Sequence, residues 1–155
     1  MINNDVLRSL QHVLGINEST MAEIFKLAEH TIEPSTVSGF LKDENASGYI
    51  ACNDNVLTLF LDGLIAYRRG TSSQNPLQGK AILPPLTNNI IFKKLRIAFD
   101  LKEEDLLELM SLANYEVSKN ELSAIFRKPG HKHYRVCNDE FLMGFLVGLT
   151  FRQWK

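Results

Sequence analysis

The chain has 155 residues, of which 45% are hydrophobic and 23% are charged, and its formal net charge is -1. This composition is that of a globular protein with a sizeable core, which argues against disorder, and the balanced charge selects no polyanionic partner for the chain as a whole. Two cysteines, Cys52 and Cys137, are too few for a disulfide framework or a four-cysteine metal site.

The N-terminal residues do not resemble a targeting segment. Asn3, Asn4 and Asp5 come before any apolar stretch, which argues against a signal peptide. The longest apolar runs are short and amphipathic, so we expect none of them to span a membrane. The sequence therefore predicts a cytoplasmic protein without a membrane partner.

The most informative feature is an internal repeat of about 67 residues. A shift of 85 residues aligns positions 3–69 with positions 88–154 without a gap. Many of the aligned pairs that are not identical are still both apolar, such as Val6 with Ile91. The identical pairs include Asn3/Asn88, Asn4/Asn89, Leu10/Leu95, Glu23/Glu108, Tyr49/Tyr134, Cys52/Cys137, Asn53/Asn138, Asp54/Asp139, Phe60/Phe145 and Gly63/Gly148. We conclude that the chain contains two copies of one unit.

The apolar spacing predicts four helices in each copy. In the first copy, we expect a helix over 5–14 with Asn4 as its cap and a second over 18–28 after Asn17. The third is expected over 35–42. Its counterpart in the second copy begins near Ser118, with Glu121 three residues later as in a capping box. No stretch alternates with period two, so we expect no sheet.

The fourth helix of each copy follows a repeated Cys-Asn-Asp, with Asn53 or Asp54 as the expected cap. Gly63 and Gly148 lie inside these helices, where a glycine costs about 1 kcal/mol relative to alanine. Their presence in both copies predicts that each fourth helix crosses a neighbour at close range. A crossing between the two copies is one arrangement that would explain it.

Between the copies, residues 70–87 are predicted to form a linker, because Gly, Ser, Asn and three prolines forbid a continuous helix. Within it, Ile82, Leu83 and Leu86 are expected to lie across apolar surface.

These elements predict an all-α fold of two tandem four-helix units, the first over 1–69 and the second over 88–155. A lone unit of this size has a marginal core, so we expect the two copies to pack face to face with pseudo-two-fold symmetry. A homodimer would bury further surface.

Several of the doubled segments carry a resemblance to a known family. They are the Asn-Asn pairs at 3–4 and 88–89, Lys93–Phe99, Arg127–Lys132, and Cys137-Asn138-Asp139 followed by Phe145–Leu149. In these segments the chain resembles the YehS-like family of bacterial proteins, a domain-of-unknown-function family, over essentially its whole length. The resemblance implies a bacterial cytosolic protein with a doubled helical domain, and it brings no activity, cofactor or catalytic residue.

The most suggestive segment for binding is Phe126–Arg135, between the third and fourth helices of the second copy. Basic residues interleaved with an aromatic residue on a Pro-Gly loop are typical of phosphate or nucleic-acid contacts. The candidate contacts are Arg127, Lys128, His131, Lys132 and Arg135. The alternative interpretation is a solvated loop without a ligand.

The net charges of the two copies also make the second copy the more basic one. Residues 1–70 carry 5 basic and 9 acidic side chains, a net of -4, whereas residues 88–155 carry 11 and 9, a net of +2. At the place of the basic loop, the first copy has Lys42 followed by Asp43 and Glu44. Any nucleic-acid contact is therefore expected on the second copy.

A helix-turn-helix motif over 21–41 is a further hypothesis. Six residues, Glu29–Pro34, separate the predicted helices, whereas the DNA-binding motif uses a turn of about 3–4 residues. Acidic residues also follow the would-be recognition helix. Major-groove recognition is therefore not the favoured interpretation.

No constellation supports a metal site or catalysis. His131 and His133 are two residues apart, which fits no zinc pattern. Cys137 with either histidine is an alternative nucleophilic pair, but Cys52 holds the same place in the first copy with no histidine near it. The repeated carboxylates are better explained as helix starts and solvated faces. They are Asp54, Asp139, Glu23 and Glu108.

We therefore interpret the chain as a non-enzymatic helical interaction module of the bacterial cytoplasm, with no catalytic residue, cofactor or metal assigned. The alternative is a nucleic-acid-binding protein that uses the basic face of the second repeat. A protein partner would be expected at an exposed apolar patch, near the helices of Gly63 and Gly148 or at Ile82–Leu86.

Overall fold

A computed structural model describes residues 1–70 and 85–154, and this part of the chain contains helices and no strand. The all-α prediction is therefore confirmed. Most of the predicted linker, including Ile82 and Leu83, lies outside the described residues, whereas Leu86 packs against the core. The helices are α1 (Asn3–Leu14), α2 (Glu18–Leu27), α3 (Pro34–Leu41), α4 (Asp54–Arg69), α5 (Asn88–Ala98), α6 (Glu103–Leu112), α7 (Lys119–Ile125) and α8 (Asp139–Leu149).

Side-chain caps fix the starts of several helices. Asn17 caps α2, Asn53 caps α4, and the predicted capping box between Ser118 and Glu121 starts α7. The prediction that Asn4 caps α1 is wrong. The helix begins at Asn3, two residues earlier than predicted, and Asn4 lies in its first turn with only 2% of its surface exposed. A polar side chain buried at this position needs internal partners, which the loop before α4 supplies.

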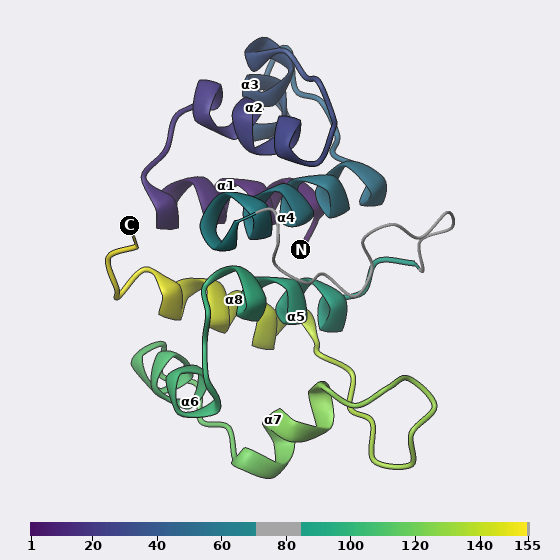
Figure 1. Ribbon diagram of the computed structural model, residues 1–155, viewed down its shortest axis with the longest axis vertical. Coiled ribbons are helices and arrows are strands. Elements are labelled where there is room, and N and C mark those ends of the chain that lie inside the picture. Colours follow the sequence, from purple (N-terminus) through teal and green to yellow (C-terminus); the bar gives the residue numbers. More distant parts are fainter. Residues whose placement is uncertain (71–84, 155) are drawn as a thin grey trace.

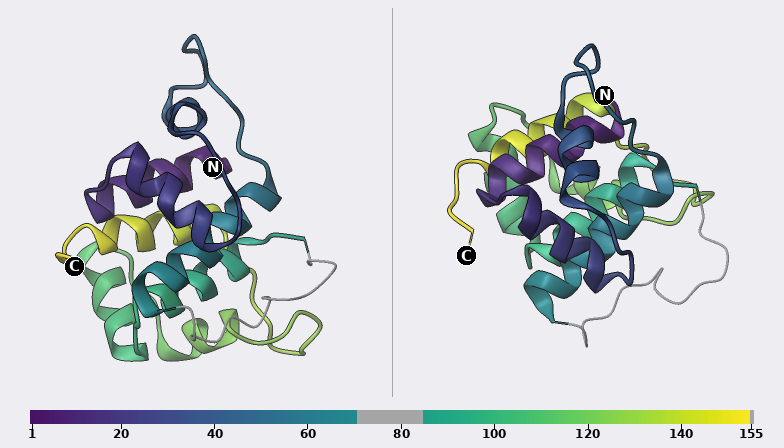
Figure 2. Two further views of the ribbon diagram at one scale, coloured as in Figure 1. Left: turned by 45° about the horizontal axis from the view of Figure 1, so that its top comes forward. Right: turned by 90° about the horizontal axis from the view of Figure 1, so that it is seen from above.

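The two copies stack with their first and fourth helices in the middle of the molecule (Figure 1). The pairs α2–α3 and α6–α7 lie at opposite outer ends (Figure 1), and the loops that follow α3 and α7 project from the helical body (Figure 2). Between the copies, α4 packs on α5 and α1 packs on α8. The first helix of each copy thus contacts the fourth helix of the other, which is the pairing that a pseudo-two-fold axis generates.

Gly63 and Gly148 allow the close crossing that the sequence predicts, but the neighbour belongs to the same copy. A Cβ on Gly63 would lie 2.0 Å from the carbonyl oxygen of Ile24 in α2. A Cβ on Gly148 would lie 2.4 Å from the carbonyl oxygen of Leu109 in α6. Each fourth helix therefore rests directly on the backbone of its own second helix, and a crossing between copies does not explain these glycines.

A buried ion pair joins the two copies at the seam between α4 and α5. Lys94 of α5 pairs with Asp62 of α4, and their side chains are 2% and 16% exposed. Burial lowers the pKa of Lys94, and the adjacent Asp62 carboxylate opposes this shift. At the other seam, between α1 and α8, the repeat places Ser9 and Val147 at the equivalent positions. The two seams are therefore equivalent in their helix pairing but differ in the side chains that meet there.

We predict that K94S and D62V each lower the free energy of unfolding by about 2–3 kcal/mol, because each removes one member of this largely buried ion pair. The double variant D62V/K94S copies the other seam and is expected to recover at least half of the summed loss. Urea unfolding of the wild type and the three variants measures this coupling. Single-variant losses that simply add would contradict it.

Candidate nucleic-acid interface

The basic loop runs from the end of α7 to the start of α8, and one asparagine of α5 holds both of its ends. Asn89 Nδ2 donates to the carbonyl oxygens of Ile125 (3.0 Å) and Arg135 (2.8 Å), and Asn89 Oδ1 accepts from the Cys137 amide (2.8 Å). At the tip, Gly130 has a φ of +92°, a conformation that favours glycine. The loop is thus anchored at its base and turns tightly at its tip.

The five predicted contact residues fall into two groups. Lys128, His131 and Lys132 are exposed, and within the described chain none of them forms an ion pair. Arg127 is half-buried and donates from Nη1 to the carbonyl oxygen of His133 at 3.2 Å. Arg135 instead forms an ion pair with Glu121 of α7 at 2.7 Å. Of the five, Arg127 and Lys128 line the same cavity, His131 and Lys132 are exposed outside its lining, and Arg135 has an acidic partner.

Glu121 is held in its charged form by the same contacts that order α7. Hydrogen bonds from the backbone and side chain of Ser118, and then the Arg135 guanidinium, lower the pKa of the Glu121 carboxyl. Arg135 is thereby engaged over the whole physiological pH range and serves to fix the loop to α7. It is a weak candidate for a ligand contact.

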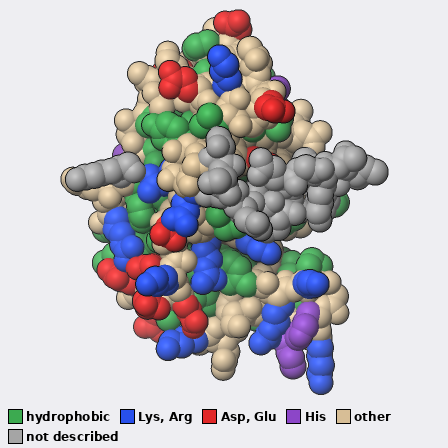
Figure 3. All heavy atoms as spheres, in the orientation of Figure 1, with side chains coloured by type: hydrophobic (Ala, Val, Ile, Leu, Met, Phe, Trp, Pro, Cys, Tyr) green, Lys and Arg blue, Asp and Glu red, His purple; other side chains and the backbone are tan. Residues whose placement is uncertain are grey.

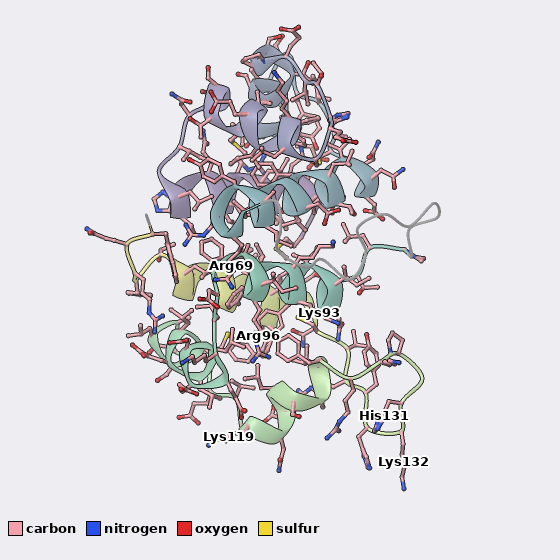
Figure 4. All side chains as sticks on the ribbon, viewed as in Figure 1. Arg69, Lys93, Arg96, Lys119, His131 and Lys132 are labelled. Carbon is pink, nitrogen blue, oxygen red and sulfur yellow. The ribbon has the colours of Figure 1, made fainter. Side chains whose placement is uncertain are left out.

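Sequence reasoning missed Lys93, which the fold brings to the loop from α5. A cavity of about 130 Å³ lies between the first turns of α5 and the basic loop. Lys93 is exposed at this cavity and makes no ion pair within the described residues (Figure 4). The cavity is lined by Thr87, Asn89, Ile90, Lys93, Ile125, Phe126, Arg127, Lys128, Pro129 and Tyr134. The paired lysines at 93–94 were visible in the sequence, but only the fold shows that Lys93 faces out while Lys94 is buried.

Lysine and arginine side chains of the second copy gather on one face of the molecule (Figure 3). Lys93, Arg96 and Lys119 all lie on this face with the basic loop (Figure 4). Arg96 makes structural contacts within the second copy. Its guanidinium lies 4.6 Å from the centre of the Phe126 ring, and its Nε donates to the carbonyl oxygen of Leu101. Arg69, at the upper edge, pairs with Asp100. Among the described residues, Lys93, Lys128 and Lys132 are exposed cations of this face that form no ion pair.

At the equivalent place in the first copy, two cationic side chains contact the loop backbone. Arg8, which corresponds to Lys93, donates from Nη1 to the carbonyl oxygen of Lys42 at 2.8 Å and pairs with Asp5. Lys42, which corresponds to Arg127, folds back onto the carbonyl oxygen of Ser47 at 3.1 Å. The contrast between the copies is clearest at this helix position, where Arg8 contacts its own loop and Asp5 while Lys93 is exposed beside a cavity.

The repeated Asn-Asn and Cys-Asn-Asp segments form a structural joint in both copies. Asn4 repeats the bonds of Asn89, donating to Phe40 and Ile50 and accepting from the Cys52 amide. Asn3 and Asn88 each donate to the aspartate that starts the fourth helix. The motif that carries the family resemblance thus connects the first helix to the start of the fourth.

The structure gives no support to the nucleophilic and metal hypotheses. Burial, and then the neighbouring Asp54 and Asp139 carboxylates, raise the pKa of the Cys52 and Cys137 thiols to about 12, so both are protonated at neutral pH. Among the described residues, no three or more His, Cys, Asp or Glu side chains could hold a metal ion. His131 accepts a hydrogen bond at Nδ1 from the His133 amide, a local contact of the loop.

A second surface feature is an apolar groove of about 320 Å³ between α1 and α8. Met143 and Val147 of α8 line it, and they are 49% and 45% exposed. Arg8 and His12 of α1 form the opposite wall. This groove agrees with the expectation of an exposed apolar patch near the Gly148 helix, but its chemistry selects no particular occupant.

The comparison with protein families agrees with the duplication. The model of the family described as "Protein of unknown function (DUF1456)" matches residues 3–70 and again residues 88–153. The chain belongs to this family. It is also 39% identical to the uncharacterized protein YehS of Escherichia coli (strain K12), over 99% of this chain and 97% of that protein. No solved structure matches the chain.

The resemblance predicted from the doubled segments is therefore confirmed, and the two DUF1456 matches coincide with the two helical units. The family match therefore agrees with the repeat, and neither description states an activity. Within residues 1–70 and 85–154, no helix is both long and apolar enough to cross a membrane.

Proposed function

We propose that this protein is a non-enzymatic binding module of the bacterial cytoplasm, and that its second repeat holds nucleic acid on its basic face. The observation that supports this most is that Lys93, Arg127 and Lys128 line one cavity, with the exposed Lys132 on the same loop (Figure 4). Three of these four side chains are exposed, and none of the four forms an ion pair within the described residues. Such cations bind phosphates by releasing condensed counterions.

The comparison between the copies strengthens this choice. The first copy has the same fold, yet Asp43 and Glu44 stand where the second copy has Lys128 and Pro129. A loop that served only to connect helices would need no such difference in charge. Nucleic acid thus takes precedence over the protein partner that the sequence alone put first.

Insertion of α7 into a major groove is not part of the proposal. Six residues separate α6 from α7, as they separate α2 from α3, so neither copy has the short turn of a helix-turn-helix motif. The cations lie on α5 and on the loop after α7, which suits contact with a phosphate backbone.

The test is a titration of labelled duplex DNA, single-stranded DNA and structured RNA at two salt concentrations. We expect affinity to fall with salt, and K93Q/K128Q to reduce the slope of log K against log salt by about 1.4 for a single strand, two phosphate contacts being lost. The matched control is K26Q/K102Q, which removes two exposed lysines that do not line the cavity. Equal effects of the two pairs, or no binding at low salt, would contradict the proposal.

A further inference from the structure

We infer that the cavity beside Lys93 receives a single-ring nucleobase, so that the ligand of the basic face is a pyrimidine-containing single strand. This inference rests on the proposed function. The cavity of about 130 Å³ is smaller than the clefts of about 300–1,000 Å³ that hold drug-sized ligands. It is close in size to an engineered cavity of about 150 Å³ that holds one benzene ring.

The lining of the cavity has the chemistry that a base and its phosphate require. Ile90, Pro129 and the half-buried Tyr134 supply apolar and aromatic wall, while Lys93 and Lys128 stand among the same lining residues with exposed ammonium groups. Stacking on an aromatic ring combined with a basic groove is the general solution for single strands. A base in a duplex is already stacked and paired, and it cannot enter such a cavity without being flipped out.

Tyr134 is the aromatic side chain of the cavity that is available for stacking. The other one, Phe126, is already engaged, because its ring stacks on Phe92 at 5.0 Å and lies under the Arg96 guanidinium. Phe126 therefore forms a rigid floor. Among the described residues, Tyr134 has no ring contact that would compete with a base.

In the first copy, an ion pair occupies the positions that correspond to Ile90 and Lys93. Asp5 corresponds to Ile90 and Arg8 corresponds to Lys93, and the pair Arg8–Asp5 reaches the backbone at Lys42. In the second copy, isoleucine replaces the aspartate and the shorter-reaching lysine replaces the arginine. These two differences between the copies can be reversed by substitution.

The experiment uses the full chain and fluorescein-labelled oligo(dT) and oligo(dA) of equal length, in single-stranded form and annealed as the duplex. We expect oligo(dT) to bind about tenfold more tightly than oligo(dA), and the duplex to bind more weakly than oligo(dT). The variant I90D/K93R, which rebuilds the ion pair of the first copy, is expected to abolish the preference while salt-dependent binding persists. N120D adds the same negative charge on exposed α7 with the cavity open, and should keep the preference.

A second variant guards against misfolding of the first. Y134L keeps an apolar wall but removes the ring, so the preference for oligo(dT) should fall towards unity, whereas Y49L at the equivalent place of the first copy should leave it unchanged. Binding of both oligonucleotides with equal affinity, or a preference that survives I90D/K93R and Y134L, overturns the inference while the proposed function stands. No binding of any strand at low salt overturns both.

Discussion

Replacing Asn89 with alanine is expected to lower the free energy of unfolding by about 4 kcal/mol. The side chain serves three backbone groups at once, namely the carbonyl oxygens of Ile125 and Arg135 and the amide of Cys137. Alanine leaves these groups without their partner at a position where only 8% of the residue surface reaches solvent. Each unsatisfied buried group costs about 1–3 kcal/mol, so the summed penalty far exceeds what the better helix propensity of alanine returns.

The neighbouring asparagine is a matched control. Asn88 is only partly buried and donates to Asp139 in an exposed contact, so N88A should cost less than about 1 kcal/mol. N4A should behave like N89A, because Asn4 makes the same three bonds in the first copy. Denaturant unfolding of the three variants gives the comparison. A loss for N89A no larger than that for N88A would show that the joint is not what holds the loop to α5.

Replacing Gly63 with alanine is expected to destabilise the protein by about 3 kcal/mol, although alanine is the better helix former. Its Cβ would lie 2.0 Å from the carbonyl oxygen and 2.9 Å from the carbonyl carbon of Ile24. The obstacle is backbone, which cannot rotate away as the end of a side chain can. Either α2 moves off α4 or the core between them opens, and both lose packing that a dense interior does not replace.

Gly144 of α8 supplies the control for Gly63. A Cβ there would meet the Tyr115 ring at 3.4 Å, an ordinary contact, so G144A should be neutral or stabilise by up to about 1 kcal/mol. G148A should follow Gly63, because its Cβ would lie 2.4 Å from the Leu109 carbonyl oxygen. Thermal unfolding in which G63A and G144A change stability alike would show that close helix crossing is not the reason for the repeated glycine.

The two copies of this chain share their frame and differ in their surface. The frame is the joint at Asn4 and Asn89 together with the crossing at Gly63 and Gly148. The surface differs at the loop before the fourth helix, whose backbone Arg8 and Lys42 contact in the first copy and which borders a cationic cavity in the second. Both copies thus keep the structural frame, and the second copy carries the candidate ligand site.

The repeat, the helices and the loop that carries most of the candidate site could all be predicted from the amino-acid sequence. Apolar spacing and capping residues are local, so the α2, α4 and α7 starts at Asn17, Asn53 and Ser118 were predicted correctly. The repeated glycines predicted a close helix crossing, and the basic residues of Arg127–Arg135 predicted the basic loop. Both features can be read from the residue types alone.

Only the tertiary structure decided which groups meet. Asn4 was predicted as a cap because a cap is a local role, but its partners at Phe40, Ile50 and Cys52 lie on a distant segment. The same limit explains Lys93, which joins the basic loop across 34 residues of chain to Arg127, and Arg135, which Glu121 removes from the site. Spacing along the chain predicts what a helix does with its own neighbours. Which side chains are buried, paired or left exposed depends on contacts between elements, and only the packed fold sets those.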